Sequence, residues 1–555
     1  MSTAAPATMA ERIAAAAQRS GGITFLGSDL GSNPGSATEV PWSQLYTDAR
    51  DMAAALQARG VRPGDHVALL GPTSRGLVTA IQATWLAGAT VVVLPLPMRL
   101  GSFDEFVSQT RARVVNADAS LVVMDPDLAA FLEPAAGDPP RVLLTQLRGR
   151  GDDLVTPPPD PDRLAVVQFT SGSTADPKGV MLTDRHILSN LDGAMAAAHF
   201  DPDSDVVVSW LPLYHDMGLL GLLTIPMITG IPMALAGPQD FMSAPARWVE
   251  WMSHFGGTAT AGPNFSYALS ARALRRLTGL DLSPWRIALN GAEPVDPATV
   301  EAFCVAGEAH GLHRGAAFPA FGMAEVTIAG TFPDPGSGLR TDVVDRRLLE
   351  SDRYAAPSLE GSGTRALALL GRPVGDLELR ICDPRSGDRL AEREVGELQI
   401  RGTSVTSGYY KQPEATADTF DGEWLKTGDL AYLVDGELVV CGRLKDVIIV
   451  GGRNVFPEDV ERAAASVEGV RAGNVIAFGV EGRRGREAVI VVAETRADDP
   501  HPVRKAVVAK VLDAVGLPPE EVILVPPGSL PKTSSGKLQR SLCRARYLEA
   551  SLTPV

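Results

Sequence analysis

The stretch that decides the fold reads Leu164-Ala-Val-Val-Gln-Phe169-Thr-Ser-Gly-Ser-Thr-Ala-Asp-Pro-Lys178-Gly179. Its first half is a run of mostly apolar residues, which predicts a buried strand over Leu164–Thr170. Its second half is a loop whose closely spaced Gly, Ser and Thr offer backbone N–H groups and hydroxyls to phosphate oxygens, with Lys178 as a point charge. It is not a Walker A loop, because Lys178 precedes Gly179, whereas the Walker Lys follows a glycine and precedes Ser or Thr. The stretch predicts a strand that ends at a phosphate site.

The same alternation of buried strands and helical stretches extends on both sides of this stretch. It predicts an α/β protein with a large multi-layer N-terminal domain, in which sheets are packed with helices. Strands are expected at 66–70, 90–94, 206–210 and 286–290, and helices at 42–59 and 76–87. The two charge-free stretches at 76–98 and 217–239 are interrupted by Gly and Pro. We therefore interpret them as buried helix-then-strand units and not as membrane spans.

The pattern of predicted strands and helices changes near the C-terminus, where a small α+β unit of about 110 residues is expected. A strand is predicted at 447–450, a turn at 451–454 and a helix that starts after Pro457. Strands at 474–478, 488–494 and 521–525 and a helix at 502–515 complete this unit. We place the domains at residues 1–442 and 443–555.

Composition and charge exclude several classes of protein. The 555 residues are 45% hydrophobic and 21% charged, which excludes a disordered, collagen-like or disulfide-rich chain. The net charge of −15 argues against a general nucleic-acid binder. The four scattered Cys have no metal-binding spacing, and the first 22 residues lack the apolar centre of a signal peptide. We expect a cytoplasmic protein without disulfides or zinc.

Lysine is scarce, since only eight of the 51 basic residues are Lys. The few that remain are candidates for roles that need an ammonium group. The C-terminal unit is mildly basic, with 17 Lys and Arg against 14 Asp and Glu from Arg443 onward, whereas the rest of the chain is acidic. The basic C-terminal unit either contacts an acidic partner, or its charge is a random difference of surface composition that has no function.

An ordered series of motifs covers nearly the whole chain and resembles the adenylate-forming superfamily of acyl-CoA synthetases, adenylation domains and luciferases. Besides the loop at 169–179, the motifs are Trp210-Leu-Pro-Leu-Tyr-His215-Asp-Met-Gly218, Asn290-Gly-Ala-Glu-Pro294, Phe321-Gly-Met-Ala-Glu325, Thr427-Gly-Asp429, Gly442-Arg-Leu-Lys-Asp446 and Leu530-Pro-Lys-Thr-Ser-Ser-Gly-Lys537. The resemblance implies a C-terminal lid that rotates between two half-reactions. A carboxylate first attacks the α-phosphate of ATP to give acyl-adenylate and pyrophosphate, and a thiol then takes the acyl group.

The resemblance also implies a role for each matched residue. Lys537 is the catalytic ammonium between the substrate carboxylate and the α-phosphate, and His215 gates the carboxylate site. Glu325 coordinates Mg²⁺ through oxygen, and Lys445 is the hinge of the lid. The ATP-binding residues are Thr170, Ser171, Gly172, Ser173, Thr174, Lys178, Gly291, Ala292, Glu293, Phe321, Gly322, Met323, Ala324, Asp429 and Arg443, with Phe321 against adenine and the last two at the ribose.

Several features are similar to the fatty acyl-AMP ligase branch, notably a 46-residue connection from Glu325 to Gly371. In that branch an insertion, placed here at about 331–364, packs against the lid and disfavours use of CoA. The acyl group then goes to the phosphopantetheine arm of an acyl carrier protein or synthase. Arg483, Arg484 and Arg486 are a candidate contact for such a carrier, or simply a solvated loop. The acyl chain is expected in an apolar tunnel near 217–233 and Phe265.

Three alternative functions remain open from the sequence. The first is an ordinary fatty acyl-CoA synthetase that uses CoA as the acceptor. The second is a P-loop NTPase or kinase, which would release the γ-phosphate and need a Walker loop. The third is an inactive scaffold, which the intact set of Lys537, Glu325, Asp429 and Arg443 disfavours.

Overall fold

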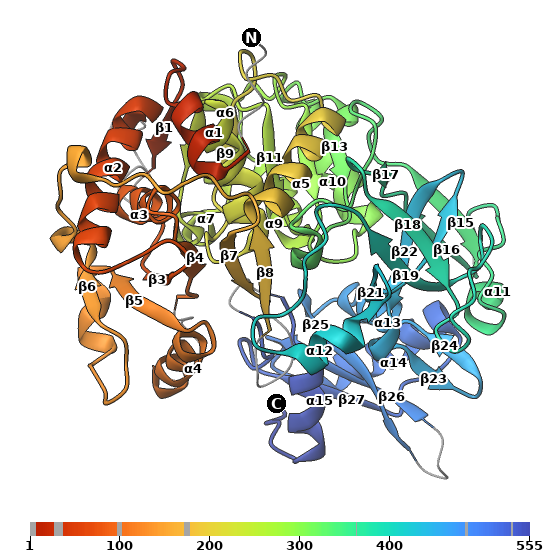
Figure 1. The fold of residues 1–555 in the computed structure, drawn as a ribbon. Coiled ribbons are helices and arrows are strands. Elements are labelled where there is room, and N and C mark those ends of the chain that lie inside the picture. The colour runs from red at the N-terminus through yellow and green to blue at the C-terminus, as the bar shows by residue number, and fades with distance from the viewer. Residues whose placement is uncertain are drawn as a thin grey trace.

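The computed structural model describes residues 7–26, 37–96, 103–170, 178–361, 363–482, 487–533 and 537–555. The predicted phosphate-loop residues Ser171, Gly172, Ser173 and Thr174 lie outside the described residues, as do Arg483, Arg484 and Arg486. Figure 1 shows a large body that the chain builds first and a smaller unit, in blue, that it builds last. The mixed α/β class and this division into a large and a small domain confirm the predicted fold class.

Two mostly parallel sheets form the centre of the body. The seven-stranded sheet has the order β13-β12-β11-β9-β10-β1-β2, and all its pairs except β1–β2 are parallel. Its strands are β1 Gly22–Phe25, β2 Thr38–Pro41, β9 Val207–Ser209, β10 Met233–Leu235, β11 Ala259–Gly262, β12 Ile287–Asn290 and β13 Ala317–Pro319. The six-stranded sheet has the order β6-β5-β3-β4-β7-β8 and is antiparallel only at β7–β8. Its strands are β3 His66–Leu70, β4 Thr90–Val93, β5 Ala119–Met124, β6 Arg141–Leu143, β7 Leu164–Phe169 and β8 Gly179–Thr183.

Helices cover these sheets because parallel strands are buried on both faces. The helices are α1 Met9–Ala16, α2 Trp42–Ala58, α3 Arg75–Leu86, α4 Phe103–Asn116, α5 Asp184–Ala197, α6 Ile225–Thr229, α7 Pro238–Ser243, α8 Ala246–His254, α9 Asn264–Leu274 and α10 Pro297–Glu308. The stretch at 76–98 is largely α3 followed by β4, and the stretch at 217–239 is a π-helix, Met217–Thr224, followed by α6 and β10. Both are the buried helix-then-strand units that the sequence predicts. Among the described residues, no helix combines the length and apolarity that a membrane span requires.

A β-rich layer joins the body to the small domain. It contains a five-stranded sheet of β18 Glu378–Cys382, β19 Gly396–Arg401, β20 Phe420–Asp421, β21 Trp424–Val434 and β22 Glu437–Arg443. Two short ribbons lie beside it, namely β14 Thr331–Phe332 with β17 Arg372–Pro373, and β15 Thr341–Asp345 with β16 Thr364–Ala368. The helices of this layer are α11 Arg346–Ser351 and α12 Pro413–Thr419. The predicted insertion at 331–364 thus contains β14, β15, α11 and the start of β16.

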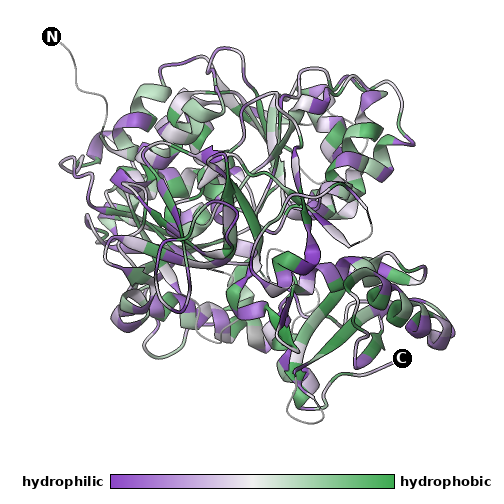
Figure 2. Cartoon of the chain, turned by 90° about the vertical axis from the view of Figure 1, so that its right-hand side faces the viewer, coloured by the Kyte–Doolittle hydropathy of each residue, from purple (hydrophilic) through white to green (hydrophobic). Residues whose placement is uncertain are grey.

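The small domain has a core on both faces of its three-stranded sheet. Successive residues of β25, such as Ala477 and Phe478, pack into opposite clusters, as the period of two along a strand requires. Figure 2 shows this unit as green, hydrophobic strands with purple, polar positions on its outer helices. Its elements are β23 Ile448–Val450, β24 Arg453–Val455, α13 Pro457–Ala465, β25 Val470–Glu481, β26 Glu487–Thr495, α14 Pro500–Val515, β27 Glu521–Val525 and α15 Arg540–Leu548.

The predicted elements of the small domain are present, with two differences. Gly451 and Gly452 both have positive φ, as a two-residue hairpin turn requires. The turn is therefore shorter than the predicted 451–454, because Arg453 already belongs to the returning strand. Strand β25 extends over twelve residues, well beyond the predicted 474–478, because it pairs with β26 along most of its length. Helix α15 was not predicted from the sequence.

Candidate active site

The candidate site lies where the parallel strands of the body end, which is where open α/β sheets bind their ligands. Thr170 follows β7, His215 follows β9, Asn264 follows β11 and Glu293 follows β12, and each lines the same large cavity. The described residues of the family motifs therefore meet at one place although they are separated by up to 368 positions, from Phe169 to Lys537. The cavity has a volume of about 2080 Å³ and also borders the small domain.

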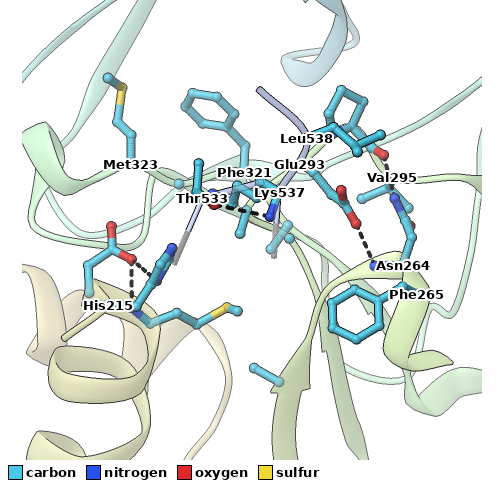
Figure 3. A pocket seen from close by; sticks show the side chains of 18 of the residues that line it. His215, Asn264, Phe265, Glu293, Val295, Phe321, Met323, Thr533, Lys537 and Leu538 are labelled. Atoms are coloured by element: carbon cyan, nitrogen blue, oxygen red, sulfur yellow. Dashed lines mark hydrogen bonds and ion pairs between the residues drawn. The ribbon is translucent and has the colours of Figure 1, made fainter. Parts of the chain in front are cut away.

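Lys537 reaches this cavity from the small domain. Its backbone N–H donates to the Thr533 hydroxyl at 3.1 Å, and Thr533 returns a hydrogen bond to its carbonyl at 2.8 Å. Figure 3 places these two residues between His215 on one side and Glu293 on the other. Burial lowers the pKa of Lys537, while the charges of Asp216 and Glu293 oppose that effect. An ammonium held between two carboxylates is well placed to meet the negative charge of an adenylation transition state.

His215 and Asp216 form one flank of Lys537. The imidazole Nδ1 lies 2.5 Å from the Asp216 carboxylate, and the N–H of Met217 donates to the same carboxylate at 2.7 Å. Burial opposes ionisation of Asp216, but His215 and Lys537 outweigh it and hold the pKa of Asp216 below its ordinary value. Asp216 orients the ring of His215 toward the cavity. Asp216 lies within the motif at 210–218, but the sequence predicts no role for it.

Glu293 forms the other flank. Its carboxylate accepts a hydrogen bond from the N–H of Asn264, the first residue of α9, at 2.8 Å. This contact puts a negative charge at a helix N-terminus, where the helix dipole favours it. Burial nevertheless raises the pKa of Glu293 above its ordinary value.

Tyr409 links two residues that the sequence predicts at the phosphates. Its hydroxyl donates to Glu325 at 2.9 Å, and the Lys178 ammonium lies 4.4 Å from the centre of its ring. Burial raises the pKa of Glu325, and the hydrogen bond from Tyr409 opposes that rise. Sequence reasoning missed Tyr409, because a tyrosine in Ser407-Gly-Tyr-Tyr-Lys411 gives no local signal of its distant partners.

Asp429 and Arg443 lie directly opposite each other on the antiparallel strands β21 and β22. The Arg443 Nε is 3.0 Å from the carboxylate of Asp429, which is 6% exposed while the arginine side chain is 50% exposed. Burial raises the pKa of Asp429 to about 6, although Arg443 opposes the rise. The pair presents a carboxylate acceptor and a guanidinium donor to the cavity, a set that matches the hydroxyls of a ribose.

The remaining predicted residues fall into three groups. Lys445 is exposed in a short turn of 3₁₀-helix at Leu444–Asp446, between the body and the small domain. Ser171 to Thr174 are outside the described residues. The others line the cavity, and they are Thr170, Lys178, Gly291, Ala292, Phe321, Gly322, Met323 and Ala324.

Several carboxylates line the cavity, but in the part of the chain that the structure describes they form no closed cage for a divalent cation. Among the described residues, no group of three or more His, Cys, Asp or Glu side chains could hold a metal by itself. Mg²⁺ typically binds through one or two carboxylates plus substrate phosphates and water. Glu325, half-buried at the cavity wall, therefore fits a Mg²⁺ ion that would arrive with ATP.

Two ion pairs, one of them fully buried, join the β15–β16 ribbon region to the small domain. Arg365 of β16 lies 3.0 Å from Asp459 of α13, and both side chains are at most 4% exposed. Arg453 of β24 pairs with Glu350 of α11, whose backbone carbonyl also accepts from Asn454 at 2.9 Å. These contacts connect the predicted insertion region to the predicted lid, next to the cavity.

Comparison with known proteins agrees with this geometry. Residues 13–410 match the family model described as AMP-binding enzyme. The chain is 40% identical to the putative ligase Rv1013 of Mycobacterium tuberculosis, over 90% of this chain and 93% of that one. It is 33% identical to the medium-chain-fatty-acid–[acyl-carrier-protein] ligase JamA of Moorena producens, over 92% and 90%. A solved structure from work on the fatty acyl-adenylate ligases of E. coli and L. pneumophila matches with a TM-score of 0.90 and 30% identity, over 98% of each chain.

These relatives and the converging motif residues settle the type of reaction. Enzymes of this family use ATP, and the proteins that this chain resembles include fatty acyl-adenylate ligases. The chain belongs to the AMP-binding enzyme family and is an acyl-AMP ligase of the fatty acyl-adenylate type.

Proposed function

We propose that this enzyme activates a fatty acid as its acyl-adenylate and then passes the acyl group to the phosphopantetheine thiol of an acyl carrier protein, and not to CoA. The observation that carries the choice of acceptor is the two ion pairs, the buried Arg365–Asp459 and the half-buried Glu350–Arg453, between the 341–368 region and the small domain. A lid held by one buried and one half-buried ion pair resists the rotation that a CoA-using arrangement would need. The name of JamA, an acyl-carrier-protein ligase, supports the same acceptor.

The first half-reaction follows from the groups at the cavity. We propose that Asp429 accepts the ribose hydroxyls, that Lys178 meets the outer phosphates, and that Phe321 contacts the adenine. Lys537 then neutralises the charge that develops between the attacking carboxylate and the α-phosphate, and pyrophosphate leaves. A Mg²⁺ ion, bound through Glu325, would supply charge neutralisation for the phosphates. His215, oriented by Asp216, closes the carboxylate end of the site against water.

The hinge and the domain limits are part of this proposal. We place the pivot at Lys445, because the 3₁₀ turn that contains it is exposed and follows the last strand of the body. Residues 1–442 then hold the acyl group and ATP, and residues 443–555 act as the lid. A hinge needs backbone freedom and no particular side chain, so Lys445→Ala should leave adenylate formation intact.

One experiment decides between the carrier and CoA. The enzyme is incubated with ATP, Mg²⁺ and a fatty acid, with CoA in one reaction and a phosphopantetheinylated acyl carrier protein in the other. The proposal expects acyl-AMP to accumulate in the presence of CoA and to be consumed by the carrier, with acyl-carrier as product by mass spectrometry. Acyl-CoA as the main product would identify the alternative, a fatty acyl-CoA synthetase. Lys537→Ala serves as the control that forms neither product.

A further inference from the structure

Part of the cavity lining lies along the seven-stranded sheet and extends from the reaction centre toward the start of its strands. Three neighbouring strands contribute residues two positions apart, which point to the same face of the sheet. These are Ala259 and Ala261 of β11, Ile287 and Leu289 of β12, and Phe318 and Ala320 on and just after β13. Leu191 and Ala194 of α5, with Ala198 just after it, lie three and four positions apart and form the opposite wall. This part of the cavity is therefore an apolar channel between a sheet and a helix.

Small side chains keep this channel open. Protein interiors are normally filled to crystal-like density, yet alanines occupy much of both walls and Gly221 of the π-helix lies on a third side. A side chain carbon added at Gly221 would meet only the end of Ile328, at 3.6 Å, so the space beside it is empty. An unfilled apolar channel that starts at the reaction centre is a site for an alkyl chain.

Phe200 lies at the far end, beside the start of β12. Arg286 holds this end in place, since its guanidinium lies 5.3 Å from the centre of the Phe200 ring and donates to the carbonyls of Ala198 at 2.8 Å and His199 at 3.0 Å. The same guanidinium binds the buried Asp205 with two hydrogen bonds of 2.8 and 2.5 Å. The channel thus ends in an aromatic ring whose position an ion pair fixes.

We propose that Phe200 is the stop that limits the length of the acyl chain this enzyme activates, an inference that rests on the proposed fatty-acid substrate. The channel follows the sheet from Gly291 to Ile287, four strand residues, or about 13 Å at about 3.3 Å each. An extended chain advances about 1.2 Å per bond, since a residue spans about 3.6 Å over three bonds. The channel therefore holds about eleven bonds, which matches unbranched acids of about ten to twelve carbons.

The test measures pyrophosphate release by the full-length enzyme with saturated acids of increasing length. Phe200→Ala should extend the accepted length, with kcat/KM for the first rejected acids rising about fourfold for each methylene that gains space. Ala198→Leu adds bulk just before Phe200. It should abolish pyrophosphate release with the longest acids that the wild type accepts and retain it with the shorter ones. Phe255→Ala is the matched control, since Phe255 is also half-buried after a helix but lies off the channel.

The possible results separate this inference from the proposed function. If Phe200→Ala does not fold, the range of chain lengths that Ala198→Leu accepts still tests whether the channel ends at Phe200. A wild-type enzyme that activates fatty acids, with unchanged length profiles in both variants, would overturn the role of Phe200 alone. A wild-type enzyme that activates no fatty acid of any length would overturn the proposed substrate as well. A profile altered equally by Phe255→Ala would show an unspecific packing effect and would also count against the stop.

Discussion

Replacing Asp429 by Asn should make the free enzyme more stable and a poorer ATP binder. Asp429 is buried beside Arg443, and that burial raises its pKa to about 6 from an ordinary 3.8. A tenfold change in proton affinity corresponds to about 1.4 kcal/mol, so ionising this carboxyl in the folded protein costs about 3 kcal/mol more than in the unfolded chain. Asn does not ionise and avoids that cost.

The raised pKa of Asp429 determines how the free energy of unfolding depends on pH. Because the folded-state pKa of Asp429 is the higher one, the unfolded chain loses its proton first as pH rises. The wild-type protein therefore loses stability between about pH 4 and pH 6, and the loss stays constant above that range. Asp429→Asn should match the wild type near pH 4 and exceed it by up to about 3 kcal/mol at pH 7 to 8.

Denaturant unfolding without nucleotide, repeated from pH 4 to 8, measures this difference. Asp205→Asn is a control of opposite sign. Asp205 is also buried beside an arginine, but there the hydrogen bonds from Arg286 outweigh burial and lower the pKa of the carboxyl. The control should lose stability by an amount that stays nearly constant from pH 5 to 8, because the folded and unfolded states differ in proton binding at Asp205 only near and below its ordinary pKa of 3.8. A gain for Asp429→Asn that does not depend on pH would refute the reasoning.

The same substitution tests the ribose contact. An amide keeps one acceptor but loses the charge, so the KM for ATP should rise in Asp429→Asn. In the wild-type enzyme the KM for ATP should rise as pH falls below about 6, where Asp429 takes up its proton. An ATP affinity that is equal in both proteins at pH 8 would remove Asp429 from the site.

Three further substitutions test the site and the domain contacts. Lys537→Ala should slow acyl-AMP formation at least 10²-fold, measured by ATP–pyrophosphate exchange, and a wild-type rate would remove it from catalysis. Tyr409→Phe deletes the 2.9 Å hydrogen bond to the half-buried Glu325 and should cost about tenfold in kcat/KM for Mg²⁺-ATP, whereas Tyr410→Phe should not. Arg453→Met leaves the carboxylate of Glu350, 1% exposed, without its partner. It should lower the midpoint of thermal unfolding, by more at pH 8 than at pH 5, and an equal loss at both would contradict that explanation.

Local patterns were sufficient to predict most elements near the site. The apolar run before Thr170 predicts β7, and Pro457 predicts the start of α13, because each depends on residues close together in the chain. Helix α15 was missed, since the segment from Arg540 to Leu548 is rich in arginine and buries only Cys543. Its position depends on packing against β25 and not on a strong apolar stripe.

The sequence by itself determined the class of enzyme and the fold class, and it predicted the domain limits and the roles of Lys537, Glu325, Asp429 and Arg443. Those conclusions follow from motifs whose residue types and order are specific. Only the tertiary structure brought Asp216 and Glu293 to the two sides of Lys537, joined Tyr409 to Glu325, and closed the apolar channel with Phe200 and Arg286. These partners lie tens to hundreds of positions apart, and a buried Tyr or Phe has no local pattern that names its neighbour. Their meeting depends on strands that end at one edge of a sheet and on a second domain folded over that edge.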